Sequence, residues 1–215
     1  MFYRDVREVT PNVGGWLDLR LEPPVIERLF SYIKTPLNKF NQHLAGNITE
    51  SNRIVDKDNW FFDNVLTQLI NHYDKKYKQF YQHPHRTTEE HLYLLENFWV
   101  NYQKKHEFNP VHGHKGVFSF VVWLKIPTDY REEHKLKFAS HSNMASASNF
   151  SFSYSNMLGV INTYAYNLDK SSEGRMIFFP AQLQHQVYPF FTSNKSRISI
   201  SGNITYDSRR FKNVV

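Results

Sequence analysis

Apolar residues recur at helical spacing in the first third of this chain and in short β-like runs afterwards. After the pair Pro23 and Pro24 the helical spacing continues until Pro36, which predicts a short amphipathic helix. A longer apolar stripe follows Asp58, which we expect to cap a helix that ends near Tyr77. The pattern therefore predicts N-terminal helices.

From about residue 92 onward, short runs rich in aromatic and β-branched residues replace the helical pattern. Clusters of Gly, Pro, Asn and Ser, which favour turns, separate these runs. The runs lie at 92–102, 117–126, 150–155, 160–166, 176–179, 186–190 and 198–204. This pattern predicts a mainly β fold with N-terminal helices, in which a jelly roll or double-stranded β-helix forms the core.

The length of 215 residues suits one well-buried domain. We expect a single domain over 1–215, with an arm and helices at 1–90 that brace a jelly-roll core at 91–206. Aromatic residues make up 16% of the chain, which supplies material for a packed core. The connection at 128–149 is long for a compact domain, and we expect it to be a mobile lid.

Charge and cysteine content narrow the classes of function. The net charge is +6, but the basic residues are scattered and no nucleic-acid motif accompanies them, so a solvated basic surface is favoured over a nucleic-acid interface. Because cysteine is absent, a metal site must use His, carboxylate or carbonyl ligands. Neither a signal peptide nor a membrane-spanning run is evident, which predicts a soluble cytoplasmic protein.

Candidate chemistry starts from two histidines that precede a long β-forming run. His112 and His114 stand at alternate positions, so on a strand their side chains point to one face about 6.5 to 7 Å apart. Chance makes such a pair unsurprising in a chain with eleven His, and His83 and His85 form another in a polar turn. The tight, Gly-containing segment before the strand favours His112 and His114 as metal ligands.

His185 is the third candidate ligand. It follows Pro180 by five residues, where one β-rich run ends and the next begins. Three imidazoles from two neighbouring strands would form a facial set with open positions, which is what Fe(II) oxygen chemistry requires. The alternative is that the histidines are hydrogen-bonded within a barrel and bind no metal.

Arg197 and Ser199 occupy alternate positions in SRISISG, so their side chains face the same side of a strand. A guanidinium fork and a hydroxyl can jointly bind a carboxylate. Since the adjacent run has no Asp or Glu, Arg197 either points to solvent or awaits an acidic ligand. Tyr102, Trp123 and Trp99 are candidates to line the same site, although each also suits a hydrophobic core.

Three segments together resemble the motifs of a known family. In chain order they are NPVHGHKGVFSFVVWLKIP, GRMIFFPAQLQHQVYPF and RISISGN. They are similar to the motifs of the Fe(II)- and 2-oxoglutarate-dependent oxygenases, especially the group encoded by marine bacteriophages, which are distant relatives of prolyl hydroxylases. The similarity covers about 99–203, and LAGNI at 44–48 also resembles the phage group.

The resemblance implies a double-stranded β-helix with His112 and His185 as ligands of Fe(II). It also implies that Arg197 and Ser199 hold the remote carboxylate of 2-oxoglutarate. One position departs from the family, because His114 stands where an Asp or Glu is usual. Three neutral imidazoles would leave the metal more positive and still able to bind the 2-oxoglutarate dianion. The alternatives are that they suit Zn(II) instead or that they disable oxygen activation.

The activity implied by the resemblance is that of a dioxygenase. Such an enzyme uses O₂ and 2-oxoglutarate to hydroxylate a peptidyl substrate, with prolyl as one option, or a small molecule, and it releases succinate and CO₂. Two alternatives stay open: a cupin-like metal-binding protein, and a catalytically idle jelly roll used as a phage structural or interaction module. A phage-encoded protein would act in the cytoplasm of the infected host.

Overall fold

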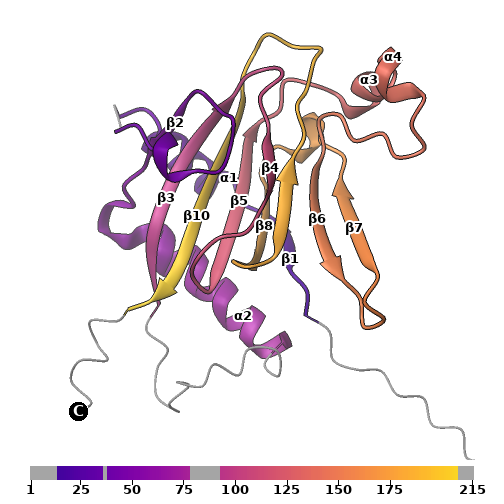
Figure 1. Ribbon diagram of the computed structural model, residues 1–215. Helices are drawn as coiled ribbons and strands as arrows, with labels where there is room; N and C mark the ends of the chain where they lie inside the picture. The colour runs from indigo at the N-terminus through magenta and orange to yellow at the C-terminus, as the bar shows by residue number, and fades with distance from the viewer. Residues whose placement is uncertain (1–13, 36–37, 78–92, 208–215) are drawn as a thin grey trace, which may run out of the picture.

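Two antiparallel sheets face each other in the computed structural model, which describes residues 14–35, 38–77 and 93–207 (Figure 1). In this part of the chain the larger sheet has the strand order β1 (Leu17–Arg20), β8 (Arg175–Pro180), β5 (Phe118–Lys125), β10 (Arg197–Tyr206), β3 (Tyr93–Gln103) and β2 (Ser51–Arg53). The smaller sheet has the order β4 (Asn109–His112), β9 (Gln184–Val187), β6 (Phe150–Ser155) and β7 (Ile161–Tyr166). The fold is therefore mainly β and jelly-roll-like.

From β3 onward the chain passes back and forth between the two sheets. Strands β3, β5, β8 and β10 lie in the larger sheet, and β4, β6, β7 and β9 lie in the smaller one. Each β-rich run expected from the sequence overlaps one of β3 and β5 to β10. Strand β4 was not expected, because its four residues NPVH include a proline and give no alternating pattern.

Alternate residues of β5 serve two different cores. Phe118, Phe120 and Val122 pack on the side of the sheet that the N-terminal helices cover. Val121 and Trp123 pack on the opposite side, toward the smaller sheet. Because side chains alternate across a strand, one strand separates a hydrophobic layer under the helices from the space between the sheets.

The helices lie on the outer face of the larger sheet (Figure 1). Helix α1 (Pro23–Tyr32) starts at the proline pair, and α2 (Thr67–Tyr77) follows a π-helical turn at Phe62–Leu66. Leu29, Phe61 and Tyr73 are at most 1% exposed there. Within the three described ranges, each helix is too short or too polar to cross a membrane.

Asp56, and not Asp58 as we expected, caps the segment that leads into α2. The Asp56 carboxylate accepts hydrogen bonds from the backbone N–H groups of Phe61 and Phe62 at 2.9 Å, and from the Tyr32 hydroxyl at 2.8 Å. Asp58 instead adopts a left-handed backbone conformation with φ of 58°, which turns the chain before the helix. Asp58 is nearest in sequence to the apolar stripe, but the turn at Asp58 places the carboxylate of Asp56 at the start of the helix.

Substitution of Asp56 tests this cap. Asp56→Asn replaces an oxygen that accepts from a backbone N–H with a group that donates, so we expect it to lower the free energy of unfolding by about 1 to 3 kcal/mol. Asp58→Asn is the matched control and should change it by less than about 0.5 kcal/mol, because Asn also tolerates the left-handed conformation. Denaturant titration of both variants gives the comparison, and equal losses would contradict the assignment.

The connection at 128–149 has more structure than the expected lid. It contains the short helices α3 (Tyr130–His134) and α4 (Lys137–Ser140). Glu133 is fully buried and accepts hydrogen bonds from the backbone N–H groups of Phe191 and Thr192 at 2.8 and 2.9 Å. The connection is therefore fastened to the neighbouring loop at this point, and mobility of its remainder stays a prediction.

Candidate metal centre

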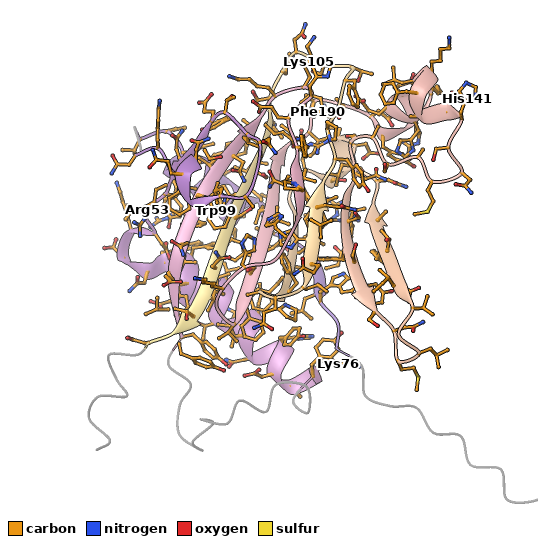
Figure 2. All side chains as sticks on the ribbon, viewed as in Figure 1. Arg53, Lys76, Trp99, Lys105, His141 and Phe190 are labelled. Carbon is orange, nitrogen blue, oxygen red and sulfur yellow. The ribbon has the colours of Figure 1, made fainter. Side chains whose placement is uncertain are left out.

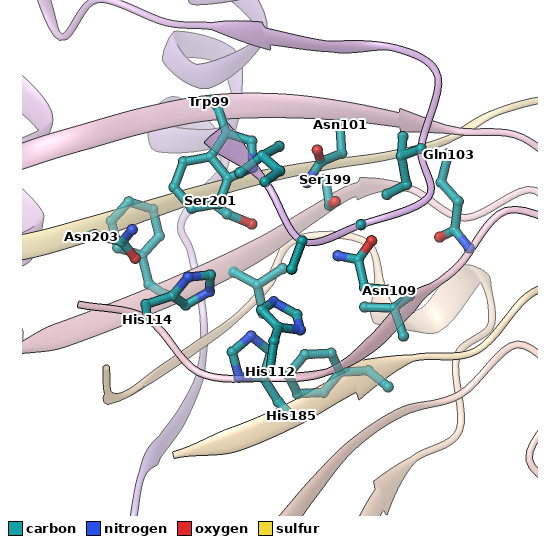
Figure 3. Close-up of a pocket in the computed structure, with 18 of the residues that line it drawn as sticks. Trp99, Asn101, Gln103, Asn109, His112, His114, His185, Ser199, Ser201 and Asn203 are labelled. Carbon is teal, nitrogen blue, oxygen red and sulfur yellow. The ribbon is translucent and has the colours of Figure 1, made fainter. Parts of the chain in front are cut away.

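Three histidines meet at the inner side of the smaller sheet (Figure 3). His112 of β4 and His185 of β9 are direct partners in the strand pairing, and His114 follows β4 by two residues. One ring nitrogen from each histidine lies within 4.8 Å of those of the other two. The other pair of histidines at alternate positions, His83 and His85, lies outside the described residues.

Local backbone contacts bring the third ring to the other two. The backbone N–H of His114 donates to the Ala181 carbonyl at 2.7 Å, which holds the end of β4 against the turn before β9. A Cβ atom on Gly113 would lie 2.9 Å from the Gln184 amide nitrogen and 3.1 Å from the Gln182 carbonyl oxygen. The glycine between the two histidines therefore supplies the space that this close approach needs.

Backbone carbonyls orient two of the three rings. His112 Nδ1 lies 2.7 Å from the Pro110 carbonyl oxygen, and His185 Nδ1 lies 2.8 Å from that of Leu183. A carbonyl only accepts, so each Nδ1 carries the proton and leaves the lone pair on Nε2. Such outer contacts are typical of metal-binding histidines, since they fix the ring and its tautomer.

The electrostatic setting keeps the histidines neutral. Burial, together with a smaller repulsion from the charge that a neighbouring imidazole would carry when protonated, lowers the pKa of His185 to about 3 and that of His114 to about 4. Burial also lowers the pKa of His112. All three rings are therefore neutral at pH 7, and neutral imidazole is the form that binds a metal ion.

Arg197 lies in the same cavity as the histidines and is 1% exposed. Its Nη2 donates to the Ser148 carbonyl at 2.9 Å, its Nη1 donates to Gln103 Oε1 at 3.4 Å, and its guanidinium lies 5.2 Å from the centre of the Phe190 ring. Its Nε is buried without a hydrogen-bond partner in the described structure. Burial lowers the pKa of Arg197 to about 10, so the group stays cationic at pH 7.

The cavity between the sheets has a volume of about 480 Å³. Its lining includes the three histidines and Arg197, and also two further candidates, Ser199 and Trp123. Every second residue of β3 and of β10 points into the cavity, and together these side chains form one wall (Figure 3). They are Asn97, Trp99, Asn101 and Gln103 on β3, and Ser199, Ser201 and Asn203 on β10.

The structure places Tyr102 away from this cavity, contrary to our expectation. Asn101 and Gln103 take the inner positions on β3, so Tyr102 points to the opposite face and packs against the core under the helices. Trp99 and Tyr102 stand three positions apart, and such residues cannot share a face of a regular strand. The alternation of side chains along β3 therefore excludes Tyr102 from the cavity once Trp99 is placed in it.

Several cavity residues were missed from the sequence. Gln103 is the register partner of Arg197 and bonds to it, which the alternation from Trp99 would have indicated. Ser148 does not line the cavity but accepts hydrogen bonds from Arg197. No sequence signal distinguishes it, because it belongs to a Ser- and Asn-rich stretch with many equivalent residues. Asn109 borders the cavity at the start of β4, and its side-chain oxygen is a buried acceptor without a partner in the described ranges.

Comparison with known proteins places this geometry in context. The 2OG-Fe(II) oxygenase family model matches residues 97–203, which include the three histidines and Arg197. Curated protein sequences gave no match.

Solved structures share the fold. A 2OG-Fe(II) oxygenase family oxidoreductase from Burkholderia pseudomallei has 14% identity and a TM-score of 0.53, over 89% of this chain and 84% of that chain. A prolyl-4-hydroxylase from Pseudomonas putida has 14% identity and a TM-score of 0.52, over 89% of this chain and 92% of that chain. The family match and the shared fold support the 2OG-Fe(II) oxygenase superfamily.

Removal of one imidazole tests the metal centre. His185→Ala should weaken binding of Zn(II) or Co(II) by at least about tenfold, because it removes one of three converging nitrogens. His141→Ala is the control, since His141 is exposed and lies at the outer end of the connection that carries α3 and α4 (Figure 2). Competition titration against a metal indicator measures both, and equal affinities would refute the proposed ligand.

The depressed pKa values predict how the metal-free protein responds to acid. Between about pH 4 and 6.5 the unfolded chain binds protons at His114 and His185 that the folded chain does not, so stability falls as the pH falls. From pH 7 to 5 we expect a loss on the order of 2 kcal/mol for each of these imidazoles. Denaturant titrations in that range measure the slope, and a metal-free double variant with Asn at both positions should show a flatter one.

Proposed function

We propose that this chain is an Fe(II)- and 2-oxoglutarate-dependent dioxygenase. The observation that carries the proposal is the presence of two complementary elements in one cavity, namely three converging neutral imidazoles and a buried guanidinium. Within the described residues this guanidinium forms no ion pair, and the Glu133 carboxylate acts on it only at longer range. The core would be a double-stranded β-helix within a single domain. From β3 onward the chain crosses repeatedly between the sheets and places four strands in each, which supports this description.

The donor set fits a divalent metal such as Fe(II). Three nitrogens on one side would leave the remaining coordination positions open toward the cavity, which oxygen chemistry needs. His112, His114 and His185 would be the ligands. When bound there with 2-oxoglutarate, Fe(II) supplies the activation of O₂ that oxidises both the cosubstrate and the substrate, with release of succinate and CO₂.

The surroundings of Arg197 fit a carboxylate of 2-oxoglutarate. A buried cation is costly without an anion, and among the described residues Arg197 forms no ion pair. Its Nε–H is an unused donor, and Ser199 stands on the same face of β10. Arg197 and Ser199 would therefore hold the end of the cosubstrate that is farther from the metal, as a charge-assisted pair.

The rest of the cavity orients the reactants and limits water. Phe150, Phe179 and Trp123 are at most 2% exposed and line the wall around the cluster. An apolar wall lowers the local dielectric constant, so the contacts of Arg197 and of the metal with an anion are stronger than they would be in water. The fixed Nδ1 contacts of His112 and His185 hold the ligand set before any metal binds.

The substrate of the proposed reaction is a peptidyl residue or a small molecule. One structure with the same fold is described as a prolyl-4-hydroxylase, which favours prolyl as the first peptidyl candidate. The resemblance of LAGNI at 44–48 to marine phage enzymes suggests a phage-encoded member that acts in the cytoplasm of the host. Leu44, Ala45, Gly46 and Ile48 border the cavity, which gives this segment a place near the substrate.

Anaerobic titration with Fe(II) and 2-oxoglutarate tests metal and cosubstrate together. We expect a visible charge-transfer band when both are present, because 2-oxoglutarate then chelates the metal. A protein that binds Fe(II) and shows no response to 2-oxoglutarate would favour the cupin-like alternative. A protein that binds no divalent metal would favour the idle structural module.

The same titration tests the role of Arg197. Arg197→Ala should weaken 2-oxoglutarate binding by about 1.5 to 3 kcal/mol, the range for hydrogen bonds to charged groups. Arg131→Ala serves as the control, since Arg131 is exposed and pairs with Asp129 and Asp169 instead. Arg197→Lys keeps the charge and checks that the loss reflects ligand binding and not unfolding; unchanged affinity in both Arg197 variants would exclude the guanidinium as the anion site.

A further inference from the structure

The cavity has a second polar end, which the proposed metal and cosubstrate do not use. Trp99 is 3% exposed and lines the cavity, and its Nε1–H has no hydrogen-bond partner in the described structure. Its ring lies 5.9 Å from that of His114, measured between centres. A buried donor left without a partner is costly, so this N–H is expected to meet an acceptor on a ligand.

Two side-chain amides stand on the same wall as Trp99. Asn101 Oδ1 accepts from the Ser51 hydroxyl at 2.6 Å, and Asn203 Oδ1 accepts from the Ser119 hydroxyl at 2.8 Å. With each oxygen engaged in this way, each amide presents N–H groups toward the cavity. Figure 3 shows Asn203 and Trp99 on the side of the cavity where His114 lies. This end is therefore lined by hydrogen-bond donors.

The charges around the cavity favour an anion. Among the described residues that line it, the only charged side chains are Arg197 and Lys115, and no Asp or Glu is present. A divalent metal and these two cations give a formal charge of about +4, and the 2-oxoglutarate dianion together with the Glu133 carboxylate that acts on Arg197 would leave about +1.

The two polar ends lie at different positions along the strands. In the pairing of β10 with β3, Arg197 lies opposite Gln103 and Ser201 lies opposite Trp99. Four residues along a strand correspond to about 13 Å. This separation between backbone positions exceeds the length of the five-carbon chain of 2-oxoglutarate, which favours a different molecule at the end near Trp99.

We propose that Trp99 and Asn203 form a subsite for the carboxylate group of an acidic primary substrate. This inference rests on the proposed function, and it names the chemical class of the substrate. Trp99 Nε1–H and the Asn203 amide donate to the carboxylate oxygens, and Lys115, which is exposed at the edge of the cavity, attracts the anion. Asn101 stands between Trp99 and Gln103 on β3 and so lies between the two ends of the cavity.

Proton–nitrogen NMR of the indole groups tests the subsite directly. The ¹⁵N-labelled protein is saturated with Zn(II), which is diamagnetic, and with 2-oxoglutarate, and the chain has only four Trp. Trp99→Phe identifies the Trp99 signal by its loss. Acetate and acetamide, which have the same shape and differ in charge, are then titrated at constant ionic strength.

We expect acetate to move the Trp99 indole proton downfield in a saturable manner, with an apparent affinity at least about tenfold above that of acetamide. Asn203→Asp places a negative charge beside the subsite and should lower the acetate affinity by about tenfold or more. Trp16 and Trp60 do not line the cavity and serve as internal controls.

Three outcomes would overturn the inference. Acetamide that binds as well as acetate would indicate a neutral substrate. No response of Trp99 to either probe would remove the subsite. A Trp99 signal that moves on addition of 2-oxoglutarate and then ignores acetate would assign Trp99 to the cosubstrate. The proposed function fails separately, if the Zn(II) protein does not bind 2-oxoglutarate at all, and the acetate titration can then be run with Zn(II) alone.

Discussion

The candidate site depends on the antiparallel pairing of β4 with β9. This pairing sets His112 directly opposite His185, although the two residues come from distant parts of the chain. The backbone bond from His114 to Ala181 and the missing side chain at Gly113 then bring the third ring into the cluster. Because these are backbone constraints, the ligand geometry exists before a metal binds, and the energetic cost of arranging it is met during folding.

The larger sheet separates the stability of the fold from the chemistry of the site. On its outer face, aromatic residues such as Phe98, Phe118 and Phe120 pack under the helices. On its inner face the same strands carry amides, hydroxyls and Arg197. The inner groups cost free energy when buried without ligands, so the outer layer must supply the stability that keeps them in place.

Local sequence patterns predicted most strands and the three histidines that meet in the structure, because both follow from periodicity two and from the spacing of histidines. The prediction failed where a tertiary contact decides the outcome. Asp56 caps the helix because a left-handed turn at Asp58 brings it there, and Tyr102 leaves the site because Trp99 had already fixed the inner face of β3. Composition indicates neither the Asp56 cap nor the orientation of Tyr102. Counting alternate positions along β3 from Trp99 would have excluded Tyr102 from the cavity.

The long connection at 128–149 belongs to the site, and this changes how Arg197 is understood. Ser148, with a φ of 70°, turns both its carbonyl and its hydroxyl oxygen to the Nη2 of Arg197, while Glu133 ties the connection to the loop that carries Phe190. These contacts satisfy one edge of the guanidinium and leave Nε for a ligand. The position of the Arg197 guanidinium is thus set by a loop outside the two sheets. An insertion or a change in that loop would alter anion binding even where every residue of the strands is kept.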